Sequence, residues 1–148
     1  MTRINIGIPP RLLSDKHLLA EHREIKRIPN HLRKYGLACT KNIPKEFTLG
    51  KGHVLFFIDK GKYTMTRYVS IFEECVNRGF RVESYIKAWE IYMDSYMMST
   101  LFNDYKPTKK DITIIAQRLE LKDPDHYGPM IAMKAIIANG LTMFVPNE

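Results

Sequence analysis

Apolar side chains recur at the spacing of an α-helix in several parts of this chain, and that spacing constrains the fold more than any other feature. The first helix is expected to begin at Ser14 or Asp15, because either side chain can cap it. Pro29 lacks an N–H group and should kink this helix or break it near Ile28. The apolar face of the helix is formed by Leu18, Ile25, Ile28 and Leu32.

Two segments in the middle of the chain also fit helices. Residues 64–78 carry an apolar stripe, and Gly79 suits the position just after a helix end. The members of this stripe are Met65, Val69, Phe72 and Val76. Residues 84–103 place aromatic side chains at near-helical spacing, at Tyr85, Trp89, Tyr92 and Tyr96. Such a stripe more often belongs to a core than to a platform for stacking bases.

The C-terminal part of the chain predicts one long helix and one short helix. The long helix follows Pro107, with Thr108 as its cap. Its core face is formed by Ile112, Ile115, Ala116 and Leu119. The short helix fits residues 129–138, before Gly140.

The segments between these helices are expected to be irregular. Residues 1–13 should form an extended arm, because Pro9 and Pro10 stop any early helix. Residues 36–62 contain several Gly and Pro residues and should be a loop, in which residues 54–58 form either a strand or a buried extended segment. The sequence therefore predicts an all-α fold: a compact single domain over residues 1–148, with about three main helices, long loops and no convincing sheet.

The charge of the chain favours a polyanionic partner. Lys and Arg number 23 against 16 acidic residues, for a formal charge of +7, which suits nucleic acid but is also found in proteins that are merely basic. The chain has only two cysteines, Cys39 and Cys75, with no CxxC or CxxxC pair, so it has no disulfide framework and no zinc site of the usual spacing. No apolar run reaches the roughly 20 residues of a membrane helix, and no signal peptide is evident. We therefore expect a cytoplasmic protein without a membrane partner.

The first helix carries a cationic stripe. On a regular helix Lys16, Arg23, Arg27 and Lys34 lie within about 40° of one another and span about 27 Å, enough to cover several phosphates of a duplex. The alternative is an ordinary solvated face, although a uniformly positive stripe repels itself at Arg23 and Arg27. Arg118 and Lys122 form a second basic pair that either extends this surface or is plain surface charge.

Glu24 lies roughly 80° from the stripe, on the border between the cationic and apolar faces. Arg27, one turn later, can hold its carboxylate by a charged hydrogen bond, and His17 lies on the same flank. The histidines of this helix are not spaced for a shared metal ion, so we expect no metal site. His53 precedes an apolar run and is interpreted as a structural histidine.

The N-terminus supplies a possible nucleophile. Thr2 is small, so removal of Met1 should leave a free α-amine. An α-amine has a pKa of about 7.7–8.0 against about 10.4 for Lys, so a useful fraction is neutral near pH 7 and can attack a sugar C1′ or an aldehyde. Many chains begin with Met-Thr, so this feature gains meaning only beside Glu24 and the cationic stripe.

Several segments resemble the bacteriophage endonuclease V family, pyrimidine dimer DNA glycosylases that are also abasic-site lyases. These segments are MTRIN at the start, HLLAEHREIKRI with its RKY continuation, FTLGKGHVLFFIDK, FEECVNRGF and, more weakly, AQRLELK at residues 116–122. The resemblance implies a compact α domain with the N-terminal arm packed between helices. It also implies an imine-forming amine at Thr2 and a catalytic carboxylate at Glu24.

The resemblance further implies DNA contacts, at Arg3, Arg23, Arg27, Lys34, Arg118 and Lys122. Lys16, His17 and His22 occupy the same helix, and we expect them to contact DNA as well. The expected partner is double-stranded DNA with a damaged or abasic site, acted on by a monomer without cofactors, in the host cytoplasm if the chain is phage-encoded.

The chain departs from the family at residues 124–130. The family has consecutive aromatic residues there that recognise the dimer, whereas this chain has one Tyr and no Trp. The alternatives are therefore a glycosylase for another lesion, an abasic-site lyase, a non-catalytic DNA-binding module, or an unrelated basic helical interaction protein.

Overall fold

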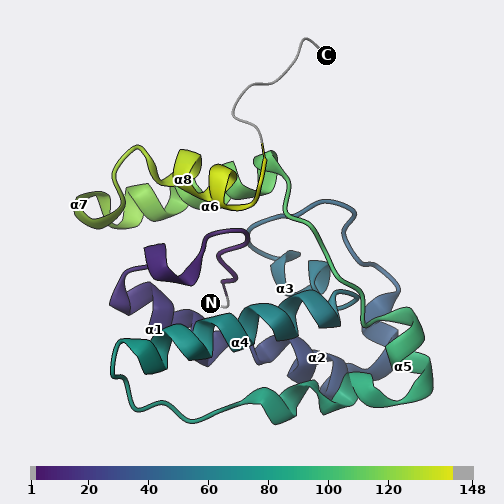
Figure 1. Ribbon diagram of the computed structural model, residues 1–148. Helices are drawn as coiled ribbons and strands as arrows, with labels where there is room; N and C mark the ends of the chain where they lie inside the picture. The colour runs from purple at the N-terminus through teal and green to yellow at the C-terminus, as the bar shows by residue number, and fades with distance from the viewer. Residues whose placement is uncertain (1–2, 142–148) are drawn as a thin grey trace. The chain divides into compact units, whose positions relative to one another are not determined.

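The computed structural model describes residues 3–141 and confirms the all-α fold class (Figure 1). Within these residues there is no β-strand, and a single antiparallel bridge joins Lys60 and Phe102. The residues divide into two compact units. The first contains residues up to Ile4 together with Leu19–Tyr105, and the second contains Asn5–Leu18 and the chain from Lys106 onward. A single domain over residues 1–148 stays a prediction.

The first unit is built mainly around η3, which contacts both α2 and α4. Tyr68 of α4 stacks on Trp89 of η3 with ring centroids 5.0 Å apart, and both side chains are buried. The elements that this unit contains, in whole or in part, are α1 (Asp15–Glu24), α2 (Arg27–Tyr35), η2 (Gly36–Thr40), α3 (His53–Phe56), α4 (Gly61–Asn77), η3 (Ile86–Met93) and α5 (Ser95–Thr100).

The first expected helix is in fact two helices, α1 and α2, separated by Ile25 and Lys26. Pro29 explains the break, because it has no N–H group to donate to the carbonyl of Ile25. The N–H of Ile28 instead donates to that carbonyl at 3.2 Å, which tightens the turn. The expected break is confirmed, and the four apolar residues of the face, Leu18, Ile25, Ile28 and Leu32, are all fully buried.

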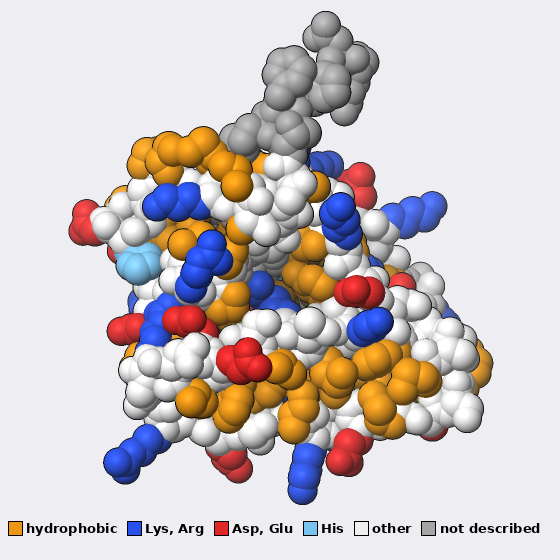
Figure 2. All heavy atoms as spheres, viewed as in Figure 1, with side chains coloured by type: hydrophobic (Ala, Val, Ile, Leu, Met, Phe, Trp, Pro, Cys, Tyr) orange, Lys and Arg blue, Asp and Glu red, His pale blue; other side chains and the backbone are white. Residues whose placement is uncertain are grey.

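Helix α4 confirms the expected helix at residues 64–78, but it buries a different face. The predicted stripe is wrong, because Val69 and Val76 are 41% and 53% exposed. Figure 2 shows hydrophobic side chains gathered on the outer side of the region where Figure 1 places α4. The residues of α4 that are buried include Arg67, whose guanidinium forms an ion pair with the buried carboxylate of Glu21. The buried face of α4 therefore carries an ion pair and is not the expected apolar stripe.

Two further expectations need correction. Residues 54–58 form neither a strand nor an extended segment, because His53–Phe56 is the short helix α3 and the rest is a turn. The segment 36–62 is therefore less irregular than expected. Residues 84–103 form the 3-10 helix η3 and the short helix α5 instead of one continuous helix. Their aromatic stripe divides as well, since Trp89 and Tyr92 are buried and Tyr96 is 57% exposed.

The second unit is built around α6 (Lys109–Lys122), which contacts α7 (Pro124–Tyr127) and α8 (Ile131–Ala138). Thr108 caps α6 as expected, in a reciprocal capping box with Asp111. The expected core face of α6 is confirmed, because Ile112, Ile115, Ala116 and Leu119 are buried. Helix α8 confirms the expected last helix.

The N-terminal arm is anchored within the second unit through Gly7. The carbonyl of Gly7 accepts a hydrogen bond of 2.7 Å from the side-chain amide of Asn139. A β-carbon at Gly7 would lie 2.5 Å from Cγ1 of Ile112, so only glycine fits at this position. The arm then turns through η1 (Pro10–Leu12) into α1, where Ser14 Oγ accepts from the N–H of His17 at 3.3 Å and so acts as the expected cap.

Among residues 3–141, no helix has both the length and the apolar character needed to cross a membrane.

Candidate active site

The break between α1 and α2 presents Glu24 beside a cation. Glu24 is the last residue of α1, where the helix dipole disfavours a negative charge by about 0.3–1 kcal/mol. Its Oε2 lies 2.7 Å from Nη1 of Arg27, and the Glu24 side chain is only 17% exposed whereas that of Arg27 is 55% exposed. The structure therefore confirms the contact expected between these two side chains. A mostly shielded carboxylate held by one cation is suited to stabilising a positively charged intermediate.

Three further cations of the first unit were expected to bind DNA. Arg23 and Lys34 are exposed, and Lys34 Nζ lies 5.2 Å from the ring centre of Tyr35. Arg3 differs, because its Nε and Nη1 atoms are shielded from solvent. The expected continuous cationic stripe on one regular helix is wrong, since α1 ends before Arg27. Lys16 and Arg23 lie on α1, and the other two members lie on α2.

His22 was expected to contact DNA, but its ring is buried in the first unit. It is 3% exposed, and its Nε2 lies 3.1 Å from the hydroxyl of Tyr68. It also packs against the rings of Phe72 and Tyr85. Burial lowers the pKa of His22. A hydrogen bond with the backbone of Glu83 opposes this effect, and the positive charges of Lys26 and Arg23 lower the pKa further. This environment gives the ring a core position, where DNA cannot reach it without rearrangement.

Lys26 was missed by the sequence analysis. It lies in the break next to Glu24, and its Nζ is 3.4 Å from the ring centre of Tyr85, a cation–π contact. Tyr85 is further fixed by its N–H, which donates to the hydroxyl of Tyr68 at 2.7 Å. No periodic pattern could reveal this contact, because it joins residues 59 positions apart in regions of different secondary structure.

The remaining expected DNA contacts lie in the second unit. Lys16 and Lys122 are exposed, and Arg118 is half-buried, which lowers the pKa of its guanidinium. His17 Nδ1 lies 2.6 Å from the hydroxyl of Tyr127, and the two rings stack at 5.5 Å. The pKa of His17 is lowered by burial and then by the positive charges of Arg118 and Lys16. These contacts favour a neutral imidazole.

Tyr127 is the one aromatic residue of the segment 124–130, and it is buried. It is 6% exposed, and its hydroxyl accepts from the N–H of Ser14 at 3.0 Å. The side chain therefore faces the interior of its own unit and is not available on the surface for stacking against a base.

Thr2 and Met1 lie outside the described residues, so the expected amine nucleophile stays a prediction. Within residues 3–141 no group of three or more His, Cys, Asp or Glu side chains is arranged to hold a metal ion.

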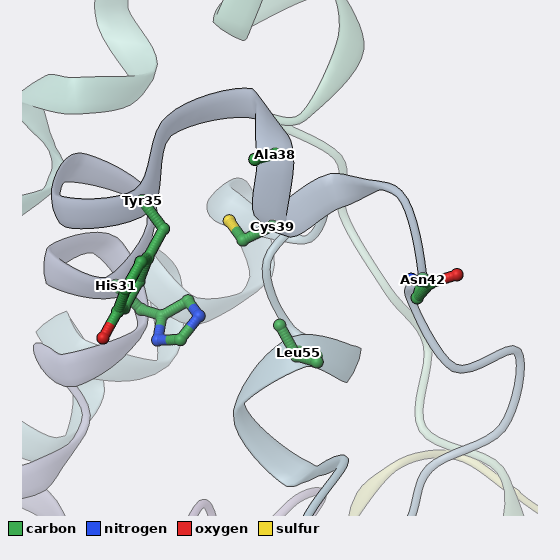
Figure 3. A pocket seen from close by; sticks show the side chains of 6 residues that line it. All are labelled: His31, Tyr35, Ala38, Cys39, Asn42 and Leu55. Carbon is green, nitrogen blue, oxygen red and sulfur yellow. The ribbon is translucent and has the colours of Figure 1, made fainter.

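A separate cavity lies elsewhere in the first unit (Figure 3). Its volume is about 380 Å³, and its walls come from α2, η2, α3 and Asn42. The ring of His31 lies beside the side chain of Tyr35 in Figure 3, and their ring centres are 4.6 Å apart. None of the residues expected to act on DNA lines this cavity.

The model of the pyrimidine dimer DNA glycosylase family matches residues 1–88. The chain belongs to this family. As a member it is a DNA-repair glycosylase, and its substrate is DNA. The matched region contains α1, α2 and the break that carries Glu24 and Arg27. Arg118, Lys122 and Tyr127 lie beyond the match. The family match therefore includes the segment around Glu24. It does not include residues 124–130, where the aromatic residues were expected to differ from the family.

Proposed function

We propose that this glycosylase removes a damaged base from double-stranded DNA and then nicks the strand as an abasic-site lyase. The observation that carries the proposal is the position of Glu24. It is a mostly shielded carboxylate, 2.7 Å from Arg27, within the part of the chain that matches the glycosylase family. The nucleophile is the α-amine of Thr2, which becomes free when Met1 is removed. The pyrimidine dimer is the lesion that family membership favours.

Binding begins with the exposed cations. Arg23, Arg27 and Lys34 neutralise phosphates, so binding weakens steeply as salt is raised. Lys16, Arg118 and Lys122 extend the phosphate contacts. The damaged nucleotide must leave the base stack before its C1′ atom becomes accessible, and a damaged base costs less to extrude than a normal one.

The glycosylase step is a displacement at C1′. The neutral Thr2 amine attacks C1′, the bond from C1′ to the base breaks, and the base leaves with the bonding electrons and takes up a proton. The amine loses a proton and the sugar ring opens, which gives a protonated imine between C1′ and the enzyme. Glu24 stabilises this positive charge, and Arg27 orients the carboxylate.

The lyase step follows from the imine. Removal of a proton from C2′, assisted by Glu24, sends electrons toward the imine and breaks the bond between C3′ and its oxygen. The departing strand keeps a 5′-phosphate. Water then hydrolyses the imine and releases the amine together with an unsaturated aldehyde on the other strand end. The scheme needs no metal or organic cofactor.

Borohydride trapping on a duplex with an abasic site tests the proposal. Reduction converts the imine into a stable amine link, so a covalent adduct of protein and DNA is expected at Thr2 by peptide mass spectrometry. Intact mass of the purified protein establishes whether Met1 has been removed. Glu24→Gln should still bind the duplex but lose strand cleavage. The absence of an adduct from processed protein, or an adduct at a lysine, would contradict the assignment of Thr2.

A second candidate keeps the chemistry and changes the lesion. Two observations favour it: the family match ends at residue 88, and Tyr127 is buried. Single-turnover cleavage of matched duplexes with a pyrimidine dimer, an abasic site or other damaged bases separates the two candidates. Cleavage of the abasic duplex alone would reduce the activity to that of a lyase.

A further inference from the structure

We propose that His53 is a positioning residue, which orients the N-terminal amine by binding the backbone of Ile4. The inference rests on the proposed function, because it concerns the same amine. Nε2 of His53 accepts a hydrogen bond of 2.8 Å from the N–H of Ile4. Both residues belong to the first unit, and 49 positions separate them in the sequence.

The imidazole of His53 can accept this bond because its other nitrogen is occupied. Nδ1 lies 2.9 Å from the carbonyl oxygen of Thr48. A carbonyl can only accept, so Nδ1 carries the proton and Nε2 keeps a lone pair directed at Ile4. The side chain is 1% exposed, and the rings of Phe47 and Phe57 pack against it with centroids 5.4 Å away. The acceptor therefore has a fixed position and a fixed tautomer.

The backbone of residues 50–53 determines where the ring of His53 lies. His53 is the first residue of α3, and its N–H donates to the carbonyl of Gly50 at 3.1 Å. Gly50 has a φ of +83°, which favours glycine. A β-carbon at Gly52 would lie 2.9 Å from Cγ2 of Thr48 and 3.1 Å from Cγ of Pro44. The loop is thus closely packed just before His53, which holds the imidazole at the end of a rigid support.

The bond to Ile4 fixes the point from which the chain continues toward Thr2. The N–H of Ile4 belongs to the peptide plane that it shares with Arg3, and this plane is rigid. Fixing the N–H therefore fixes the plane, including the α-carbon of Arg3. The ψ and φ angles of Arg3 and the ψ angle of Thr2 then separate the plane from the amine nitrogen. Standard backbone lengths keep that nitrogen within about 5 Å of the Arg3 α-carbon.

The side chain of Ile4 alone cannot give this orientation. It is fully buried, which holds the residue in place, but an aliphatic side chain leaves the peptide plane free to rotate. The hydrogen bond from His53 removes that freedom. Displacing a reacting group by about 1 Å can cost on the order of 100-fold in rate, so the effect should appear in the chemical step.

Two variants of His53 separate the bond to Ile4 from the bond to Thr48. In His53→Gln the amide oxygen can take the position of Nε2 and accept from Ile4, whereas in His53→Asn the shorter amide can take the position of Nδ1 and contact only Thr48. The rate of adduct formation on abasic duplex is measured in single turnover at saturating enzyme, so that binding does not enter. We expect His53→Asn to be slower by roughly 10- to 100-fold and His53→Gln to stay within about threefold of the parent protein.

Ile71→Val is the control for general destabilisation. It removes a methyl group from the core of the first unit, at a residue that is not part of the support described for His53. Its rate of adduct formation should match that of the parent protein. Hydrogen exchange at the Ile4 amide, followed by NMR, reports the bond itself: it should be slow in the parent protein and in His53→Gln, and fast in His53→Asn.

The outcomes distinguish this inference from the proposed function. If the parent protein forms no adduct, the proposed function is wrong, and the role proposed for His53 is wrong as well. If the parent protein forms the adduct and His53→Asn reacts at the same rate, only the inference fails. Equal losses in His53→Asn, His53→Gln and Ile71→Val would also overturn it, because they would show that His53 matters only for folding.

Discussion

The carboxylate of Glu24 and the guanidinium of Arg27 meet at 2.7 Å across the two residues that separate α1 from α2. In a continuous helix this would be an ordinary contact between residues three positions apart. Here Glu24 ends one helix and Arg27 begins the next, so Pro29, which causes the break, also shapes the site. The break leaves the carboxylate of Glu24 at the C-terminal end of α1, where the helix dipole disfavours a negative charge. This position therefore adds little to the stability of the helix.

Arg27→Ala tests whether this pair serves catalysis more than stability. Arg27 is 55% exposed, so the pair should contribute less than about 1 kcal/mol to the free energy of unfolding. Cleavage of abasic duplex should fall by about 10-fold or more, because Glu24 loses the cation that orients it. Urea denaturation and single-turnover cleavage at saturating enzyme measure the two effects.

Arg78→Ala is the matched control for Arg27→Ala. Arg78 Nε lies 2.8 Å from Oε2 of Glu74, and this pair at the end of α4 has no assigned role in the reaction. The substitution removes the same charge from another pair of arginine and glutamate, in which the arginine is 19% exposed. Its cleavage rate should therefore be unchanged. Equal losses of cleavage in the two variants would point to a general effect of charge.

Arg23→Ala should lower the salt dependence of DNA binding. Arg23 is exposed on α1, and each phosphate that a cation neutralises adds about 0.9 to the slope of log affinity against log salt. The slope should fall by about 1 in the variant, uniformly across DNA sequences. Fluorescence anisotropy at several salt concentrations measures it. Lys62→Ala, at an exposed position of α4 with no expected DNA contact, should leave the slope unchanged, and equal slopes in both variants would remove Arg23 from the interface.

Local patterns in the sequence predicted the helices whose determinants lie close together. Thr108 and Asp111 form the capping box of α6 from residues three positions apart, and the core face of that helix is a simple apolar stripe. Pro29 likewise acts on the carbonyl of Ile25, four positions away. In such cases the physical cause is complete within one or two helical turns.

Features that depend on distant partners could not be predicted. The guanidinium of Arg67 is buried because it pairs with the carboxylate of Glu21, 46 positions away. The apolar residues of α4 alone could not indicate that the helix face with Arg67 packs into the core. The bond between His53 and Ile4 likewise joins residues that are far apart in the sequence. The ring was expected to be structural from its apolar neighbours, but its acceptor atom is directed at the N-terminal arm, which only the fold reveals.

Gly7→Ala should destabilise the protein by roughly 2–5 kcal/mol, from about 1–2 kcal/mol of backbone strain and about 1–3 kcal/mol of overpacking. Gly7 has a φ of +75°, and a β-carbon there would lie 2.5 Å from Ile112. Gly79→Ala is the control, because Gly79 has a φ of +84° but open space around the β-carbon. It should lose only the strain. Chemical denaturation measures both, and equal losses would mean that the approach to Ile112 relaxes without cost.

The stability of the protein should fall as the pH is lowered from about 7 to 5.5, and His22 should contribute to the fall. Its buried ring, beside Lys26 and Arg23, has a pKa below the ordinary value of about 6.5. The unfolded chain therefore binds protons first as the pH falls through 6.5, which favours unfolding, whereas above that pH both states are neutral and the stability is retained. In His22→Phe the free energy of unfolding should depend less steeply on pH. A pH dependence that is the same in His22→Phe as in the parent protein would show that His22 is not buried as a neutral ring.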